Sequence, residues 1–257
     1  MKLASCIING TEQLAFCVGD NLYATKDINT NLPATIGELL QNWDAQIDNM
    51  HAQDKAIKEG KAAGNPIPYA TANLLAPVPH PTSCRDGYAF RQHVAAARRN
   101  RKVDMIAEFD QYPIFYFTNH NAIQGPGEIP VMPDHLKKLD FELEAAVVLC
   151  KKGRNVRAAD ADQYIGGYMI MNDMSARTLQ MEEMLLNLGP AKGKDFSTVI
   201  GPVLVTPDEL EPYRKAPKAN HTGNTYDLKM RCYVNGIQVS EGSMGDMDWT
   251  FAEIEER

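Results

Sequence analysis

Three acidic side chains alternate along one short stretch of the chain, at Asp140, Glu142 and Glu144. Alternate side chains of a β-strand lie on the same face, so these carboxylates would all point one way. The residues that follow, Ala145–Leu149, are all apolar and predict a buried strand. Buried carboxylates need an ionic partner, a proton or a metal ion. The alternative is a half-exposed strand with an acidic outer face, and the pattern alone favours that alternative.

Two further acids add to this set. Asp173 follows the apolar segment Ile165–Met171, and Asp86 lies in a Pro- and Gly-containing loop just before a predicted helix. Four carboxylates would suit a hard divalent cation such as Mg²⁺, Ca²⁺ or Mn²⁺ better than zinc. A chain with 33 acidic residues also brings some acids together by chance, so the sequence leaves open whether these four converge.

The elements that would position these acids fall into two parts. At the start, turn dipeptides separate three strands, and a helix with capping-box spacing between Thr35 and Glu38 follows. These elements are expected at residues 3–8, 13–18, 21–25 and 35–47. We therefore expect a small N-terminal α/β domain over residues 1–75, and a second domain over residues 76–257.

Strands outnumber helices in the second part. Apolar runs predict strands at 114–117, 141–149, 165–171 and 199–205, a hairpin over 226–239 that turns at Asn235-Gly236, and helices at 90–101 and 176–188. Methionines 171, 174, 181 and 184 are interpreted as core residues, and histidines 80, 120 and 135 as solvated ones. The pattern predicts an α+β fold built on a largely β core.

Composition excludes several classes of protein. The 257 residues carry a net charge of −7, which argues against a general nucleic-acid coat. The five cysteines have no C-x-x-C spacing, so the sequence indicates neither a disulfide framework nor a zinc ribbon. The first residues turn polar too early for a signal peptide, and no apolar stretch approaches the roughly 20 residues of a membrane span. We expect a reduced, cytoplasmic protein that binds neither nucleic acid nor membranes.

Four blocks, in order, resemble the fumarylacetoacetate hydrolase family from about residue 74 to the end. They are DGYAFRQH at 86–93, LDFELE at 139–144, MNDMSARTLQ at 171–180 and LGPAKGKDF at 188–196. Each block alone is weakly specific, whereas the four together are highly specific. The resemblance implies a mixed β-roll catalytic domain, a homodimer, and one divalent cation in the active site.

The resemblance also implies residue roles. It matches the metal-site residues of the family to Asp86, Glu142, Glu144, Asp173, Lys194 and Thr198. The catalytic residues correspond to His93, Lys194 and Arg177, and the substrate-binding residues to Tyr88 and Gln180. One basic residue among Arg98–Lys102 would meet a substrate carboxylate, as in the family, and the sequence does not show which one.

The implied activity is metal-dependent hydrolysis of a C–C bond in a 1,3-diketo acid of the fumarylacetoacetate or acylpyruvate type, as in aromatic amino acid catabolism. A histidine such as His93 would activate water, while the cation stabilises the enolate. The alternatives on the same scaffold are a decarboxylase or isomerase of 2-keto acids, or a non-catalytic metal-binding member.

Two departures from the family pattern bear on this expectation. Met184 stands where the fumarylacetoacetate-specific branch has a tyrosine, which weakens the case for fumarylacetoacetate itself as substrate. Family members also continue past the equivalent of Ile254, so we expect a C-terminal truncation and, with it, low stability or activity.

Overall fold

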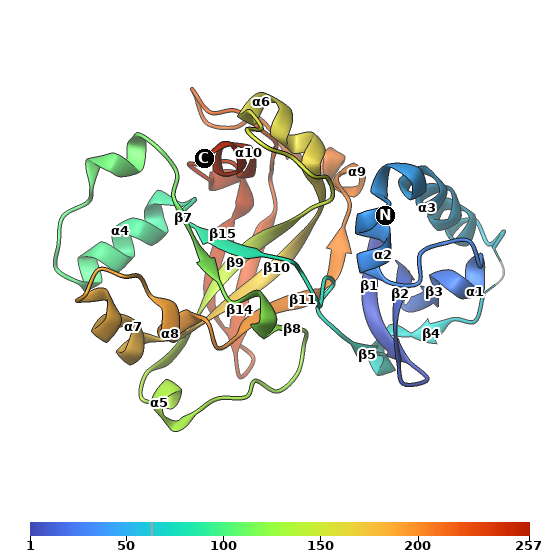
Figure 1. Ribbon diagram of the computed structural model, residues 1–257, viewed down its shortest axis with the longest axis horizontal. Helices are drawn as coiled ribbons and strands as arrows, with labels where there is room; N and C mark the ends of the chain where they lie inside the picture. Colours follow the sequence, from blue (N-terminus) through green and yellow to red (C-terminus); the bar gives the residue numbers. More distant parts are fainter. Residues whose placement is uncertain (63) are drawn as a thin grey trace.

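The computed structural model describes residues 1–62 and 64–257, which are arranged around one large, mostly antiparallel sheet (Figure 1). The strands are β1 (Lys2–Ile8), β2 (Thr11–Val18), β3 (Asn21–Ala24), β4 (Ile67–Pro68), β5 (Asn73–Leu74), β6 (Cys84–Gly87), β7 (Phe115–Thr118), β8 (Ile123–Gln124), β9 (Leu139–Leu149), β10 (Ile165–Ala176), β11 (Thr198–Val205), β12 (Arg214–Lys215), β13 (Thr225–Tyr226), β14 (Lys229–Val234) and β15 (Ile237–Ser243).

The helices are short except for one. They are α1 (Thr25–Ile28), α2 (Ile36–Gln41), α3 (Trp43–Lys58), α4 (Arg91–Asn100), α5 (Pro133–Leu136), α6 (Ala158–Ala161), α7 (Arg177–Met184), α8 (Ala191–Lys194), α9 (Pro207–Leu210) and α10 (Phe251–Glu256). Across residues 1–62 and 64–257, none of them combines the length and the apolar character needed to cross a bilayer.

The N-terminal elements follow the sequence pattern closely. The β1–β2 hairpin turns at Asn9 and Gly10, both with positive φ, as a tight two-residue turn requires. Thr35 caps α2 by accepting a hydrogen bond from the backbone of Glu38. The single helix predicted over 35–47 is divided, because Asn42 leaves helical geometry and a second helix, α3, begins at Trp43.

The N-terminal strands and the later strands belong to one sheet of order β4-β3-β2-β1-β11-β10-β9. The link is the antiparallel pairing of Lys2 with Val205 and of Leu3 with Leu204. Leu3 and Leu204 also share one hydrophobic core cluster with residues of α2 and α3. This pairing makes the sheet continuous across the predicted domain boundary near residue 75. The boundary itself stays a prediction.

Two elements near the predicted site acids differ from the expectation. β10 continues to Ala176, so Asp173 lies inside the strand rather than after it, because backbone pairing with β9 outlasts the apolar run. Asp86 likewise lies on a short strand, β6, paired with β7, and not in a loop. The hairpin turn at Asn235-Gly236 is confirmed between β14 and β15.

The helix predicted over 176–188 is shorter at both ends. α7 begins at Arg177 and ends at Met184. Three leucines beyond α7 are exposed and do not pack into the core of this chain: Leu185, Leu186 and Leu188. Met171 and Met174 are buried as expected, whereas Met181 is 43% exposed, so its interpretation as a core residue was wrong.

Candidate metal-binding active site

Strand register brings the acids of distant segments onto one face of the sheet. Thr198, Asp173 and Glu142 are direct cross-strand partners on β11, β10 and β9. Such partners have side chains on the same face. Glu144 lies two residues along β9 and therefore points to that face too. The predicted alternation of acids on β9 thus faces a cavity of about 2790 Å³ rather than an acidic outer surface.

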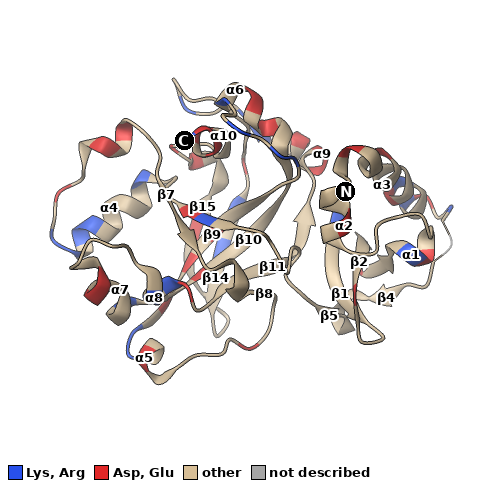
Figure 2. Cartoon of the chain, in the orientation of Figure 1, with Lys and Arg blue, Asp and Glu red and all other residues tan. Residues whose placement is uncertain are grey.

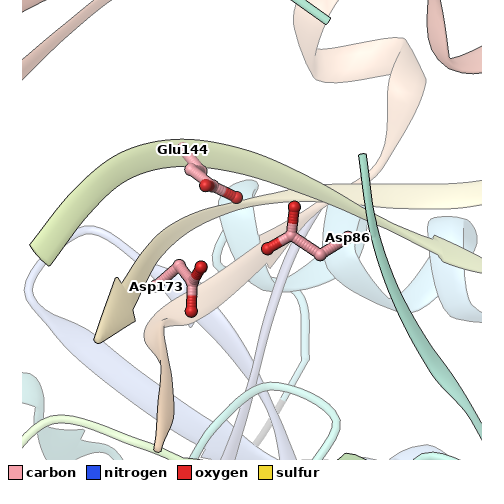
Figure 3. Close-up of side chains that lie close together, drawn as sticks. All are labelled: Asp86, Glu144 and Asp173. Atoms are coloured by element: carbon pink, nitrogen blue, oxygen red, sulfur yellow. The ribbon is translucent and has the colours of Figure 1, made fainter. Parts of the chain in front are cut away.

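Asp86 reaches the same point from the separate β6–β7 ribbon. Figure 3 shows the carboxylates of Asp86, Glu144 and Asp173 turned toward one another. One oxygen from each lies within 4.8 Å of the others. We call these three residues the carboxylate triad. Its members come from three strands, so the triad forms only when the ribbon packs on the sheet.

Electrostatics indicate that the triad suits a cation. Burial and the neighbouring Asp173 raise the pKa of Asp86 to about 8. Burial, Asp86 and Asp173 raise the pKa of Glu144 well above its ordinary value. Carboxylates with such raised pKa values are poorly stabilised as anions, and a divalent cation would remove both the burial and the repulsion penalties. An all-oxygen donor set fits Mg²⁺, Mn²⁺ or Ca²⁺.

Lys194 lies beside the triad as a buried counter-charge. It is 3% exposed, and its Nζ donates to Asp173 and, at 3.0 Å, contacts Glu142 Oε1. Burial alone would lower the pKa of Lys194, but Asp173 and Glu142 raise it. The protonated side chain compensates the charge of these carboxylates. Its predicted place in the metal site stays a prediction.

Glu142 forms direct ion pairs with cationic side chains. Arg177 Nη1 donates to Glu142 Oε1 at 2.7 Å, on the same oxygen that Lys194 contacts. Burial would raise the pKa of Glu142, but Lys194, His93 and Arg177 lower it to about 2. Glu142 is thus ionised and adjoins the carboxylate triad without being one of its three members. Its predicted place among the metal ligands stays a prediction.

Arg177 donates hydrogen bonds to further polar side chains at the rim of the cavity. Its Nε donates to Asp140 Oδ2 at 2.8 Å, and its Nη1 donates to Gln180 Oε1 at 3.0 Å. The first residue of α7 thereby contacts both the first acid of the alternating set, Asp140, and the predicted substrate-binding Gln180. Thr198 is 3% exposed, and it lies in register with Asp173.

His93 lies at the mouth of the cavity. It projects from α4, and its Nε2 is 3.7 Å from Glu142 Oε2, the oxygen that Arg177 and Lys194 leave open. The ring of Tyr88 is 6.1 Å away from the imidazole, and both residues line the cavity. The structure thus brings the predicted histidine and tyrosine to the site.

Several basic residues lie on and just after α4, which carries blue segments in Figure 2, and they differ in whether they line the cavity. Arg101 lines it, and its Nε donates to the backbone oxygen of Ala97. Arg98 instead donates to the backbone oxygen of Asp104. Among the predicted candidates, Arg101 is therefore the guanidinium placed to meet an anion in the cavity.

Two side chains escaped the sequence reasoning. Tyr116 on β7 donates from its hydroxyl to Asp86 Oδ2 at 3.4 Å. His135 is 4% exposed and stacks on Phe196 with ring centroids 4.0 Å apart, so its interpretation as a solvated residue was wrong. Both contacts depend on pairings between distant segments, for which periodicity gives no signal.

Comparison with known proteins identifies the family of the chain. The profile of the family described as "Fumarylacetoacetate (FAA) hydrolase C-terminal" matches residues 82–256, which is more than half of the chain. The chain belongs to the fumarylacetoacetate hydrolase family. The resemblance drawn from the four sequence blocks is confirmed.

Similar proteins within this family carry different activities in their names. The chain is 29% identical over 232 residues to "Oxaloacetate tautomerase Fahd2a, mitochondrial" of Rattus norvegicus, covering 86% of this chain and 63% of that protein. It is 40% identical over 123 residues to a fumarylacetoacetase of Oryza sativa subsp. japonica, covering 42% of this chain and 28% of that protein. The chain therefore spans about three-fifths of the length of the tautomerase.

Solved structures show the same fold. A maleylpyruvate hydrolase from Sphingobium sp. SYK-6, in complex with manganese (II) ion and pyruvate, superposes with a TM-score of 0.68 at 20% identity, covering all of this chain and 81% of that one. This likeness supports the predicted α+β architecture, in which a large antiparallel sheet carries the site. The separate identity of a small N-terminal unit stays a prediction.

Proposed function

We propose that this chain is a divalent-cation-dependent enzyme that hydrolyses a C–C bond in a 1,3-diketo acid of the fumarylacetoacetate or acylpyruvate type. The observation that carries the proposal is the convergence, at one cavity, of the carboxylate triad with a histidine–carboxylate pair, His93 and Glu142. A purely structural cation site would need no such pair beside it. A cation held by the triad would supply a Lewis acid for negative charge that develops on a substrate oxygen.

His93 is the proposed general base. Its imidazole would take a proton from water at one nitrogen, while Glu142 Oε2 faces Nε2 from 3.7 Å. Glu142 has a pKa lowered to about 2, so it stays ionised and would stabilise the imidazolium that forms. Lys194 and Arg177 occupy Oε1 of the same carboxylate and thereby fix its orientation toward the histidine.

The rim of the cavity would recognise the acid group of the substrate. Arg101 lines the cavity, and no carboxylate within the described residues forms an ion pair with it. Gln180, held by Arg177, presents its amide at the same rim. We propose Arg101 as the partner of a substrate carboxylate, and Gln180 and Tyr88 as orienting residues. The homodimer and the cytoplasmic location stay predictions.

A second candidate is a tautomerase or decarboxylase of a 2-keto acid such as oxaloacetate. Proteins named oxaloacetate tautomerase match 84–87% of this chain, which is the specific support for this alternative. The same triad would serve it, because tautomerisation also develops negative charge on a carbonyl oxygen. It differs in needing a proton transfer without attack by water.

Product analysis separates the two candidates. Purified chain with Mn²⁺ or Mg²⁺ is incubated with an acylpyruvate, fumarylacetoacetate or oxaloacetate, with and without EDTA. It is compared with His93→Ala and with the control His51→Ala, which lies on α3 away from the cavity lining. Two carboxylate fragments from a diketo acid, lost with EDTA and in His93→Ala alone, would support hydrolysis. Keto–enol conversion or CO₂ release from oxaloacetate, without cleavage of either diketo acid, would refute hydrolysis and support the second candidate.

A further inference from the structure

The members of the carboxylate triad are not equally well fixed. Glu144 and Asp173 lie on β9 and β10, which are paired along eleven positions within the large sheet. Asp86 lies on β6, which pairs only with β7 in a two-stranded ribbon outside that sheet. Its carboxylate therefore has less backbone support than the other two, and its orientation depends more on side-chain contacts.

The ribbon has two distinct faces. Register places Asp86 opposite Tyr116, so both side chains lie on one face of the ribbon, the face from which Asp86 reaches the carboxylate triad. On the other face, the Arg85 guanidinium lies 4.6 Å from the ring centre of Phe117 and 5.4 Å from that of Phe115. This cation–π stacking links β6 to β7 on the face opposite Asp86 and Tyr116.

The two strands also approach closely beside this pair. A Cβ placed on Gly87 would lie 2.7 Å from the backbone oxygen of Ile114, so only glycine permits the observed spacing. The hydroxyl of Tyr116 then lies 3.4 Å from Asp86 Oδ2. Within residues 1–62 and 64–257, it is the one side chain that donates a hydrogen bond to this carboxylate.

We propose that Tyr116 is a positioning residue that orients Asp86 for the divalent cation, an inference that rests on the cation site of the proposed function. A phenol keeps its proton at neutral pH and donates a single hydrogen bond, so it restrains the carboxylate without adding charge. Hydrogen-bonded partners of ligating carboxylates commonly change metal affinity by about 10- to 100-fold when removed. At 3.4 Å the bond is long for an O–H···O contact, so it contributes little to folding.

The test measures cation affinity directly. Mn²⁺ is titrated into wild type, Tyr116→Phe and Tyr233→Phe, with binding followed by calorimetry and by the electron paramagnetic resonance spectrum of bound Mn²⁺. Tyr233 is a matched control, because its hydroxyl donates to Gln238 Oε1 over the same 3.4 Å but lies on the exposed β14–β15 hairpin. We expect the Kd for Mn²⁺ to rise about 10-fold in Tyr116→Phe alone, with a changed spectrum and an unchanged melting temperature.

Other outcomes identify which inference fails. A Kd within twofold of wild type in Tyr116→Phe overturns the positioning role, whatever happens to the melting temperature. A lower melting temperature with unchanged Kd would show that Tyr116 acts only in packing, which also overturns it. If wild type itself binds no Mn²⁺, the proposed function fails at its cation site, and this inference fails with it.

Discussion

Replacing Lys194 by methionine removes a buried cation that touches both Asp173 and Glu142. Methionine keeps the length and most of the volume of the side chain, so the change isolates the charge. Breaking a buried ion pair from one side costs about 3–5 kcal/mol, because the remaining charge stays buried without a partner. At about 2–4 °C per kcal/mol for a chain of this size, the melting temperature should fall by roughly 6–20 °C.

The assay is thermal unfolding followed by circular dichroism in EDTA at pH 7. Lys192→Met is the matched control, because Lys192 lies on the same short helix but is exposed and contacts neither carboxylate. The difference in melting temperature between Lys194→Met and Lys192→Met should narrow as Mn²⁺ is added, since a bound cation would replace the missing positive charge. It should also narrow toward pH 2, where the carboxylate of Glu142, with its pKa lowered to about 2, takes up a proton.

A melting temperature for Lys194→Met within 2 °C of that for Lys192→Met would refute the reasoning. It would mean that the buried carboxylates are already neutral in the folded chain, so that Lys194 compensates no charge. If the melting temperature of Lys194→Met falls as expected but Mn²⁺ does not restore it, the result would support the ion pair. It would contradict a cation site beside Lys194.

Two further predictions concern stability away from the triad. Burial and the nearby Asp162 raise the pKa of Glu255 from 4.5 to about 7, so the folded chain holds this proton more tightly than the unfolded chain and loses stability as pH rises from about 4.5 to 7. At pH 8, Glu255→Gln should therefore melt at a higher temperature than wild type, because its unfolding free energy should be larger by about 1–2 kcal/mol after allowance for solvent screening. At pH 4 the two proteins should melt at the same temperature. Equal melting temperatures at pH 8 as well would contradict this prediction. A Cβ on Gly125 would lie 2.4 Å from the backbone carbonyl carbon of Leu75. Gly125→Ala should therefore lower the unfolding free energy, measured with urea, by about 1–3 kcal/mol. Gly37→Ala is the control and should not lower it, because the nearest atom to a Cβ there is 3.8 Å away.

The sequence alone predicted the acids that form the site but not their convergence. Alternation along β9 correctly places Glu142 and Glu144 on one face, because the two-residue repeat is a local property. The approach of Asp86 depends on how the β6–β7 ribbon packs against the sheet, which no local pattern encodes. The family resemblance supplied that information, since it relates four separated blocks to one known arrangement.

Errors in the predicted elements have physical causes as well. β10 extends past its apolar run because Asp173 and Ser175 keep the backbone pairing with β9, while the Ser175 hydroxyl donates to the backbone oxygen of Asp173. A polar stretch on a paired strand is indistinguishable from a loop in sequence. The contacts of Tyr116 and His135 were missed for a related reason, because each partner lies in a distant segment.

Cation binding by the carboxylate triad is measured most directly by melting wild type and Glu144→Gln in EDTA and again in Mn²⁺, with the exposed Glu241→Gln as control. The pKa of Glu144 is raised well above its ordinary value by burial and by Asp86 and Asp173. In EDTA, Glu144→Gln should therefore melt at or above the wild-type temperature, because a repelling acid is gone. In Mn²⁺ the order should reverse, because wild type gains stability from a bound cation and the variant gains much less. An equal Mn²⁺-induced rise in wild type and Glu144→Gln, or no rise in wild type, would contradict a cation site at this triad.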